Sequence, residues 1–481
     1  MNVNSKRSKK QADNNVPATN VLSQEEYNKR IATIIGGMKS NTWKDLETKG
    51  KFAKNDKLTF IDDDTLIVGC DIGSEKHYIR AIDTRGRELI SRALSFVNNE
   101  EGFLEAKNWM LDLAARNDKK QIVLGLDPTG HYWFCLAVWL VNNGISVVQV
   151  NPYAVKQTKE LEDNSQLKSD EKDPKPIANL VKDGNYGMPY VPEGLYADLR
   201  RLSMFRDQLM EDRTRVVNRL HRELTIYFPE YKDAFGKKID GTFTLELLKE
   251  APVPEDIVSF GTDGVRNVWR EAKLRGRGYS KAAEIVRLAE ESIGLKDGTC
   301  GGRETIKWFA QQAMDLQKKM DDIERQLHEK CKELPNAENV LEIKGIGENI
   351  LAGILAEMGN ISRFDDVKEI QKISGLGLVA CSSGKHKGET RISHRGRKRL
   401  RYWLFQAAKS AVTHAEEFKT LHIYYTTRAE NPLKKMQSLI AIACKILRII
   451  YTLLKTGRKY DPEKMLKDIR HPAVKETSQA A

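Results

Sequence analysis

The stretch 66-LIVGCDIGSEKHYIRAIDTRG-86 decides the fold of the N-terminal part of this 481-residue chain. Its apolar runs, 66–72 and 78–83, are separated by a polar turn, and a second turn leads to another run over 88–96. Short runs bounded by turn residues predict strands, so we expect a three-stranded meander here.

The segment that follows alternates between helical and extended patterns. We expect helices at about 99–116 and 130–143, and strands at 122–126 and 145–150. A meander followed by alternating helices and strands predicts an α/β domain with a mixed sheet.

Composition places the chain among folded globular proteins, with 40% hydrophobic and 30% charged residues. Its six cysteines lie far apart without a C-x-x-C pair, which argues against a disulfide framework or zinc module and favours a reducing cytoplasm. No signal peptide is apparent, and the most apolar stretch, 438–455, is short and interrupted by Lys445 and Arg448. These features exclude the secreted and membrane classes.

Positive charge is concentrated near the C-terminus. Residues 381–460 contain 18 Lys and Arg against four Asp and Glu, whereas the net charge of the whole chain is +12. The segment 385-KHKGETRISHRGRKRLR-401 alone carries eight basic residues and one acid. A field this focused suits a polyanion such as nucleic acid, although a solvated basic face would look the same.

The chain divides by pattern into five parts. A basic arm with a short helix at about 24–38, capped by Ser23 and Glu26, occupies 1–60. We expect the α/β domain over 61–190, a helical coiled-coil connector over 191–335, a mainly helical C-terminal domain over 336–460 and a tail over 461–481. The length of the chain is consistent with two to four domains.

The connector carries a heptad pattern. Apolar residues recur with 3-4 spacing from 306 to 334, broken at Lys330, and more loosely along 195–228. This spacing predicts a coiled coil, formed either by two helices of one chain or between two chains.

Four aspartates form the first candidate site. Asp71 and Asp127 end predicted strands, and Asp170 and Asp173 lie in 168-KSDEKDP-174. Carboxylates at strand ends converge at one sheet edge, and an i, i+3 pair at a helix start shares one face. Such a set suits two Mg²⁺ ions about 3.5–4 Å apart that clamp a phosphodiester, although a single aspartate at a strand end is usually a turn former or cap.

Two further motifs lie in the C-terminal part. Lys344, Gly345 and Gly347 precede an amphipathic helix, in a helix–hairpin–helix-like turn that suits a phosphate or serves only as a tight turn. Ser382 and Ser383 stand in a Ser-Ser-Gly loop before the basic segment. A serine amid this charge would be an activated nucleophile near a phosphate, whereas Ser-Gly alone indicates a turn.

Five blocks together resemble a known family. They are 71-DIGSEKH-77, 127-DPTGHYW-133, 151-NPYAVKQTK-159 leading to 168-KSDEKD-173, 343-IKGIGENILAGILAEMGNISRF-364 and 383-SGKHKGETRISHRGRKRLRYWLFQAA-408. In this order they are similar to the DEDD-type transposases of bacterial insertion sequences, insertion-sequence family one-ten, and to the related Piv-type DNA invertases. The predicted element order of 66–150 is also that of ribonuclease H-like folds.

The resemblance implies a RuvC-like catalytic domain of the ribonuclease H fold, a coiled-coil connector and a C-terminal domain with a serine nucleophile. Asp71, Asp170 and Asp173 match the first, third and fourth acids. Asp127 stands where the family usually has Glu, so its carboxylate lies about 1 Å further back, and a metal there requires a small backbone shift or an intervening water. The family's serine directly precedes glycine, which favours Ser383 over Ser382.

The implied activity is DNA transposition through a phosphoserine link, assisted by two Mg²⁺ ions. We expect double-stranded donor and target DNA, a bridge RNA as guide, a dimer or tetramer in which nucleophile and acids meet between subunits, and nucleoid association in a bacterial cytoplasm. The expected nucleic-acid contacts are Lys344, Gly345, Gly347, Lys385, Lys387, Arg391, Arg395, Arg397, Lys398, Arg399 and Arg401.

Three other readings of the sequence stay open. An unguided Piv-like invertase would use the same residues on DNA alone. A RuvC-like junction resolvase or nuclease would need the acids without the serine. A nucleic-acid-binding protein with a decayed acidic site would show salt-dependent binding and no metal-dependent chemistry.

Overall fold

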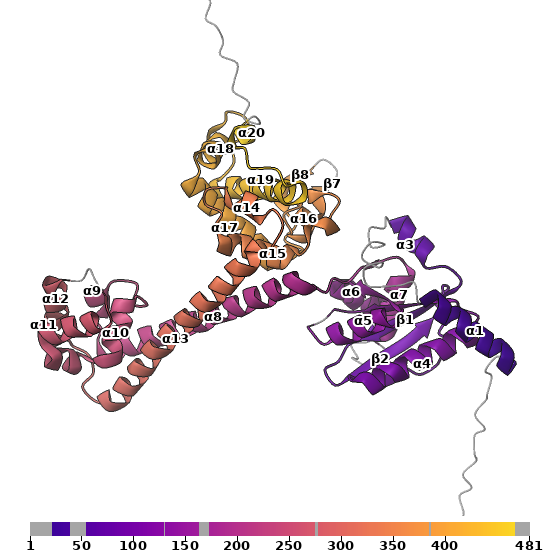
Figure 1. The fold of residues 1–481 in the computed structure, drawn as a ribbon, viewed down its shortest axis with the longest axis horizontal. Helices are drawn as coiled ribbons and strands as arrows, with labels where there is room; N and C mark the ends of the chain where they lie inside the picture. The colour runs from indigo at the N-terminus through magenta and orange to yellow at the C-terminus, as the bar shows by residue number, and fades with distance from the viewer. Residues whose placement is uncertain are drawn as a thin grey trace, which may run out of the picture. The chain divides into compact units, whose positions relative to one another are not determined.

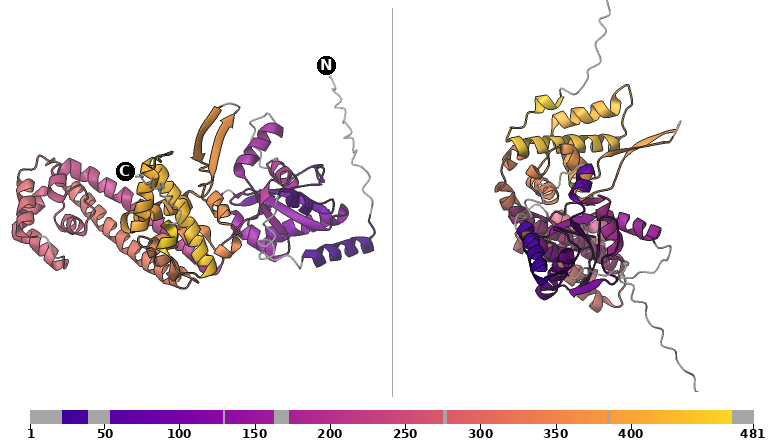
Figure 2. Two further views of the ribbon diagram at one scale, coloured as in Figure 1. Left: turned by 90° about the horizontal axis from the view of Figure 1, so that it is seen from above. Right: turned by 90° about the vertical axis from the view of Figure 1, so that its right-hand side faces the viewer.

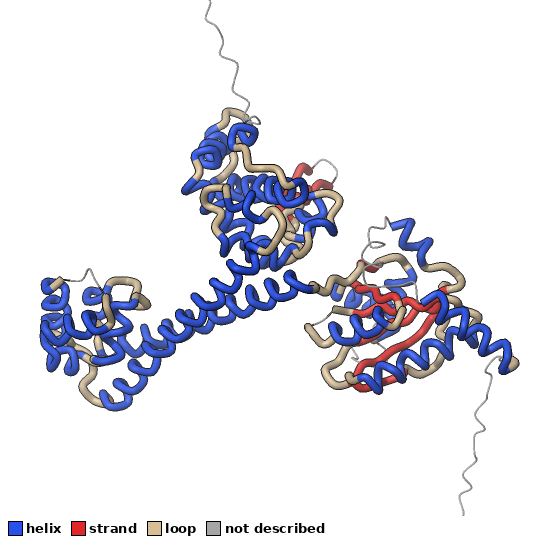
Figure 3. The backbone as a smooth tube through the Cα atoms, viewed as in Figure 1, coloured by secondary structure: helices blue, strands red, loops and turns tan. Residues whose placement is uncertain are grey.

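The computed structural model describes residues 22–38, 54–128, 130–162, 173–274, 278–383 and 386–466. The chain divides into two compact units, Met1–Val191 and Pro192–Ala481. The first contains the main sheet and the second is mostly helical (Figure 3).

Unit 1 is built on a six-stranded mixed sheet (Figure 1). Its strands lie in the order β3-β2-β1-β4-β5-β6, where β2 is antiparallel to β1 and β3, β4 is parallel to β1 and β5, and β6 is antiparallel to β5. The strand bounds are β1 Thr65–Asp71, β2 Lys76–Ile82, β3 Leu94–Val97, β4 Gln121–Leu126, β5 Ser146–Val150 and β6 Tyr186–Gly187. This arrangement confirms the predicted mixed α/β layout.

Helices cover both faces of this sheet. On one face, Leu66, Val68 and Leu124 pack with α4 (Glu100–Arg116), α5 (Trp133–Asn142) and α1 (Gln24–Met38). On the other, Ile67 and Val123 pack with α6 (Pro152–Glu162) and α7 (Pro174–Lys182). The short α3 (Lys54–Phe60) completes the unit. The alternation of side chains along β1 and β4 therefore separates two cores.

The third predicted strand is shorter than expected. Only Leu94–Val97 forms β3, and Glu88 makes an isolated bridge with Ile82. The backbone N–H groups of Arg85 and Arg87 donate to the Asp83 carboxylate at 2.9 and 2.8 Å in the turn before this bridge. The backbone then bends over 89–92, so regular pairing with β2 begins only at Leu94. The Ser23 hydroxyl accepts from the Glu26 N–H at the start of α1, in agreement with the expected cap.

Two glycines of the sheet form its contact surface for α7. Gly69 of β1 and Gly125 of β4 are direct partners in the parallel ladder. A Cβ atom at Gly69 would stand 1.9 Å from the Pro174 carbonyl oxygen, and one at Gly125 would stand 2.3 Å from a Val181 methyl. Only glycine lets the α7 backbone approach this closely, so the pair fixes where α7 lies.

In unit 2, two 34-residue helices, α8 (Gly194–Tyr227) and α13 (Thr299–Lys332), pack along each other and run antiparallel (Figure 1). The residues buried along this pair include Leu199, Leu209, Val216, Leu220 and Leu224 of α8 and Ile306, Ala313, Met320, Ile323 and Leu327 of α13. Lys330, which interrupts the heptads, forms an ion pair with Asp198 at 2.8 Å. The apolar spacing thus pairs helices within the chain.

The ends of this helix pair carry two smaller helical groups. Between α8 and α13, a cap forms around Phe228 and Trp269, from α9 (Tyr231–Phe235), α10 (Thr242–Glu250), α11 (Pro254–Glu271) and α12 (Tyr279–Glu290). After α13 follow α14 (Ala337–Leu341), α15 (Glu348–Met358), a 3-10 turn (Ile361–Arg363), α16 (Val367–Ile373), strands β7 (Leu378–Ser383) and β8 (His386–Ile392), α17 (Lys398–His414), α18 (Glu416–Thr427), α19 (Lys435–Thr456) and α20 (Pro462–Leu466).

Within the described residues, α19 is the one helix with the length and composition of a membrane span. Its Ile442, Ile446 and Ile450 are fully buried in the core shared with α15 and α17. Its apolar character therefore serves packing inside unit 2.

Replacing Gly69 tests the close packing of α7 against the sheet. We expect Gly69→Ala to destabilise unit 1 by about 1–3 kcal/mol, because the added methyl displaces the first turn of α7. Chemical denaturation followed by circular dichroism measures this change. Gly187→Ala is the control, since no atom lies within 4 Å of its Cβ position; equal stability of both variants would contradict the assignment.

Candidate functional site

Two aspartates lie side by side at one edge of the sheet in unit 1. Asp71 is the last residue of β1, and Asp127 directly follows β4. The parallel register pairs Cys70 with Leu126, so the two aspartates follow neighbouring positions on strands about 4.8 Å apart. Because alternate residues of a strand share a face, Asp71 and Asp127 belong to the face on which α7 packs against Gly69 and Gly125.

Asp173 comes to the same face from α7. It occupies the N-cap position immediately before Pro174, and its side chain is almost fully buried. The Lys159 ammonium of α6 lies 2.6 Å from the Asp173 carboxylate. Lys159 thus compensates a buried negative charge that would otherwise be costly.

The donor chemistry of this edge suits a hard divalent cation, which prefers carboxylate oxygens. Asp71, Asp127 and Asp173 share one face, whereas Asp170 lies outside the described residues. Among the residues that the structure describes, no three His, Cys, Asp or Glu side chains form a group that could hold a metal ion. The edge therefore offers two neighbouring carboxylates, with a third engaged by Lys159.

The predicted serine lies on a β-hairpin in unit 2. Ser382 and Ser383 are the last two residues of β7. Ser382 pairs with Lys387 and Ser383 with His386, and the ladder is irregular between Ala380 and Ser382. The hairpin extends from the neighbouring helices of the unit (Figure 2). Lys385 lies outside the described residues. The expected loop is thus the end of a strand, directly after an irregularity in the ladder.

The basic segment after the hairpin has an exposed part. Arg391, Arg395 and Lys398 are exposed to solvent. Arg391 belongs to β8, Arg395 to the connecting loop and Lys398 to the first turn of α17. These three cations are placed where a large polyanion can reach them.

The other three arginines of this segment bond within the protein. Arg397 donates to the carbonyl oxygen of Glu357, and Arg401 donates to that of Ser374 at 2.9 Å. Arg399 reaches back to α8, where its guanidinium lies 2.7 Å from the Asp207 carboxylate. These contacts give the three arginines a structural function that the charge pattern did not reveal.

The Arg399 contacts form a cluster of buried charge. Besides Asp207, Arg399 lies 3.3 Å from the Glu357 carboxylate of α15, whose side chain is only 5% exposed. Burial raises the pKa of Asp207, while Arg399 and Arg206 beside it act in the opposite direction. Arg399 therefore connects α17, α8 and α15, and neutralises carboxylates that are removed from water.

The glycine-containing turn connects α14 to α15. Gly345 has a φ of +90°, and a Cβ there would stand 2.8 Å from the Ser410 carbonyl oxygen of α17. Gly347 is the N-cap of α15 and has open space at its Cβ position. Lys344 is exposed beside them. Packing against α17 thus explains Gly345, while Gly347 and Lys344 stay accessible at a helix N-terminus.

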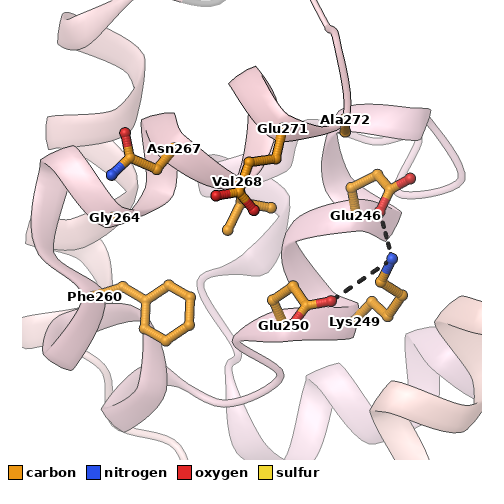
Figure 4. Close-up of a pocket in the computed structure, with 9 residues that line it drawn as sticks. All are labelled: Glu246, Lys249, Glu250, Phe260, Gly264, Asn267, Val268, Glu271 and Ala272. Carbon is orange, nitrogen blue, oxygen red and sulfur yellow. Dashed lines mark hydrogen bonds and ion pairs between the residues drawn. The ribbon is translucent and has the colours of Figure 1, made fainter.

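A separate polar pocket lies between α10 and α11 in the helical cap (Figure 4). Lys249 forms ion pairs with Glu246 at 2.9 Å and Glu250 at 3.6 Å, and Phe260 closes one side. None of the residues that line this pocket belongs to the sequence-predicted set. Lys249 thus partly neutralises the carboxylates of this pocket.

Three residues that form ion pairs at these sites were not predicted from the sequence: Lys159, Asp207 and Glu357. Lys159 stands inside the quoted block 151–159, yet nothing in its spacing connects it to Asp173. Asp207 lies 192 positions before Arg399 in the chain and pairs with it through the fold alone. Contacts over such separations leave no periodic signal in a single sequence.

Comparison with known proteins identifies the family. Residues 68–229 match the model of the DEDD-type IS110 transposase, and residues 337–423 match the model described as the transposase IS116/IS110/IS902 family. The chain belongs to the IS110 family of transposases. The two matched segments hold Asp71, Asp127, Asp173 and Ser383, and residues 230–336 of this transposase lie between them.

Similar proteins extend over most of the transposase. An uncharacterized 44.8 kDa protein of insertion element IS116 from Streptomyces clavuligerus is 24% identical over 83% of this chain and 97% of its own length. The pilin gene-inverting protein of Moraxella bovis is 23% identical over 76% of this chain and 90% of its own length. These matches make the protein an enzyme of the transposase and DNA recombinase type.

Removal of Arg399 tests the structural function of the inward arginines. We expect Arg399→Ala to destabilise unit 2 by roughly 2–3 kcal/mol, because Asp207 and Glu357 lose their counter-charge. Denaturant unfolding followed by circular dichroism measures this loss. Arg395→Ala, an exposed change in the same segment, should stay within about 0.5 kcal/mol of the parent transposase. A reversed order would show that Arg399 acts at the surface instead.

Proposed function

We propose that this transposase cuts and rejoins DNA through a covalent link at Ser383, assisted by a divalent cation held by its aspartates. The observation that carries the proposal is the placement of Asp71 and Asp127 at the same end and on the same face of neighbouring parallel strands. Carboxylates so arranged suit a divalent cation, and such a cation would stabilise negative charge at a phosphodiester.

We assign unit 1 to the ribonuclease H-like, RuvC-like folds. The support is its antiparallel β3-β2-β1 meander continued by the parallel strands β4 and β5. In this assignment the acidic edge is the catalytic edge. The α8–α13 pair is then the connector to the C-terminal part that bears the serine.

Asp71, Asp127, Asp170 and Asp173 would hold the cation, most simply Mg²⁺, which would neutralise negative charge on the phosphate. Asp127 is shorter than the glutamate usual in the family, and it directly follows β4. Lys159 holds the Asp173 carboxylate by an ion pair and so preserves the position of that ligand in the absence of metal.

The serine performs the transfer. The Ser383 Oγ attacks the phosphorus of a DNA phosphodiester, an Oγ–P bond forms, and the bond from phosphorus to one bridging oxygen breaks. The serine proton leaves to a base, and the released DNA oxygen takes up a proton. A second DNA hydroxyl then reverses these changes, so a new phosphodiester forms without ATP.

Accessible cations hold the nucleic acid. Arg391 is exposed on strand β8 of the hairpin, and Arg395 and Lys398 are exposed after it. Lys344 is exposed with Gly347 at the start of α15. We assign phosphate contacts to these residues. We further propose that a bridge RNA selects donor and target DNA by base pairing, and that the transposase acts as a homo-oligomer on the bacterial nucleoid.

Substitution of the serines tests the covalent step. We expect Ser383→Ala to abolish strand exchange and the covalent protein–DNA adduct, because the attacking oxygen is lost, while Ser382→Ala retains both. Denaturing gel electrophoresis of labelled element-end DNA measures the adduct. Asp71→Asn should retain DNA binding and lose more than about a hundredfold in rate. Full cleavage by Ser383→Ala would instead support a nuclease that uses only the acids.

The guide is tested on transposase purified from cells that carry its native flanking DNA. We expect one discrete RNA, transcribed from beside the gene, to remain bound and to resist deoxyribonuclease but not ribonuclease. Sequencing of that RNA should show loops complementary to donor and target DNA. Heterogeneous fragments, or recombination that survives removal of RNA, would contradict guidance.

The second candidate function is an unguided DNA invertase. The similarity to the pilin gene-inverting protein of Moraxella bovis, over 76% of this chain, favours it. The same serine and aspartates would then act on DNA alone. Inversion of a DNA segment between element ends in the absence of RNA distinguishes this function from guided transposition.

A further inference from the structure

The paired helices α8 and α13 bear a groove with an exposed tryptophan. Trp308 of α13 is 58% exposed, although tryptophan is usually well covered in folded proteins. It lines the groove together with Arg215 and Arg219 of α8 and with Gln312 and Lys319 of α13. The α13 residues lie in the segment 230–336 between the two family matches, whereas Arg215 and Arg219 lie near the end of the first match.

Helical spacing places these side chains on one surface. Arg215 and Arg219 are four residues apart on α8, and Trp308, Gln312 and Lys319 follow one another at i, i+4 and i+11 on α13. Beneath them, Leu209 and Val216 are 7% exposed and belong to the packed cores of the unit. The floor is therefore rigid, and it supports a flat aromatic ring that projects into solvent.

The cations of the groove differ in their pairing. Arg215 forms an ion pair with Asp212, and Asp315 accepts a hydrogen bond from Gln311. Arg219 and Lys319 are exposed and make no ion pair within the described part of the chain. Two cations of the groove are thus available for an anionic ligand, and Lys319 lies about 16 Å along α13 from Trp308.

We propose that this groove binds unpaired nucleotides, with a nucleobase stacked on Trp308 and phosphates of the same strand on Arg219 and Lys319. An exposed aromatic face beside a line of cations is the arrangement by which proteins hold single-stranded nucleic acid without reading its sequence. The inference rests on the transposase acting on nucleic acid, but it requires neither Ser383 nor a bound metal.

The composition of the groove favours nucleic acid over a protein partner. Trp308 is its only large exposed apolar side chain, and charged residues surround it. A protein interface of useful size needs a larger apolar centre and excludes lysine from that centre. A single nucleobase, in contrast, matches the area of one indole ring.

Binding of an oligothymidylate about 16 nucleotides long tests the stacking contact. We expect Trp308→Ala to weaken binding about tenfold and Trp308→Phe to retain most of it, because phenylalanine keeps an aromatic face. Fluorescence anisotropy of labelled oligonucleotide measures the affinity, and circular dichroism confirms the fold. Tyr279→Ala removes a similarly exposed aromatic ring, 57% exposed, from the helical cap and should leave the affinity unchanged.

The salt dependence tests the phosphate contacts. We expect the double variant Arg219→Ala, Lys319→Ala to reduce the slope of log affinity against log salt by about 1.4, since each phosphate contact on a single strand contributes about 0.7. Arg325→Ala is the control, because Arg325 is as exposed but is paired with Asp322. An unchanged slope in the double variant would overturn the assignment.

Two outcomes separate this inference from the proposed catalytic function. Ser383→Ala should bind the oligonucleotide as tightly as the parent transposase, so loss of recombination in that variant leaves the groove unaffected. Equal affinity of Trp308→Ala and the parent, with a change of oligomeric mass in sedimentation, would show a protein contact and would overturn the inference.

Discussion

The contact between α7 and the sheet is the constraint on which the acidic edge depends. The Pro174 carbonyl oxygen occupies the space that a side chain at position 69 would need, and Val181 does the same at position 125. Because Gly69 and Gly125 are ladder partners, the helix lies close across two neighbouring strands. That closeness brings Asp173 to the face that Asp71 and Asp127 share, so the two glycines position the third carboxylate beside the two that the strand register places.

Charge in the C-terminal part serves two purposes that composition alone does not separate. Arg397, Arg399 and Arg401 bond inward, and Arg399 holds Asp207 and Glu357 against the cost of their burial. Lys398 and Arg395 point their charge to solvent within the same short segment. The helical period explains part of this division, since Lys398 and Arg399 are successive residues of α17 and are rotated by about 100° around its axis. The inward arginines fasten the start of α17 to α8 and α15, and the outward cations lie on the surface of the same segment.

The sequence predicted the helices and strands better than the long-range contacts between their side chains. Strands β1, β2, β4 and β5 and the heptad helices were foreseen because side-chain alternation and apolar spacing are local signals. The ends of β1 and β4 therefore located Asp71 and Asp127 correctly at one edge. Lys159 and Asp207 were missed, because an ion pair across many residues exists only once the chain is folded. The length of β3 was overestimated, since the backbone bends over 89–92 and pairing with β2 begins only at Leu94.

Electrostatics explains why the transposase divides its charge between two units. A group of aspartates repels a phosphodiester, and it becomes attractive only when cations neutralise either the acids or the phosphate. The cations of residues 381–460 lie in unit 2, whereas Asp71, Asp127 and Asp173 lie in unit 1. Lys159 compensates one of these three acids, and one lysine is too little to hold a polyanion. Under the proposed function, DNA must therefore be retained by the basic unit before its phosphate can approach the acids, in one chain or between subunits.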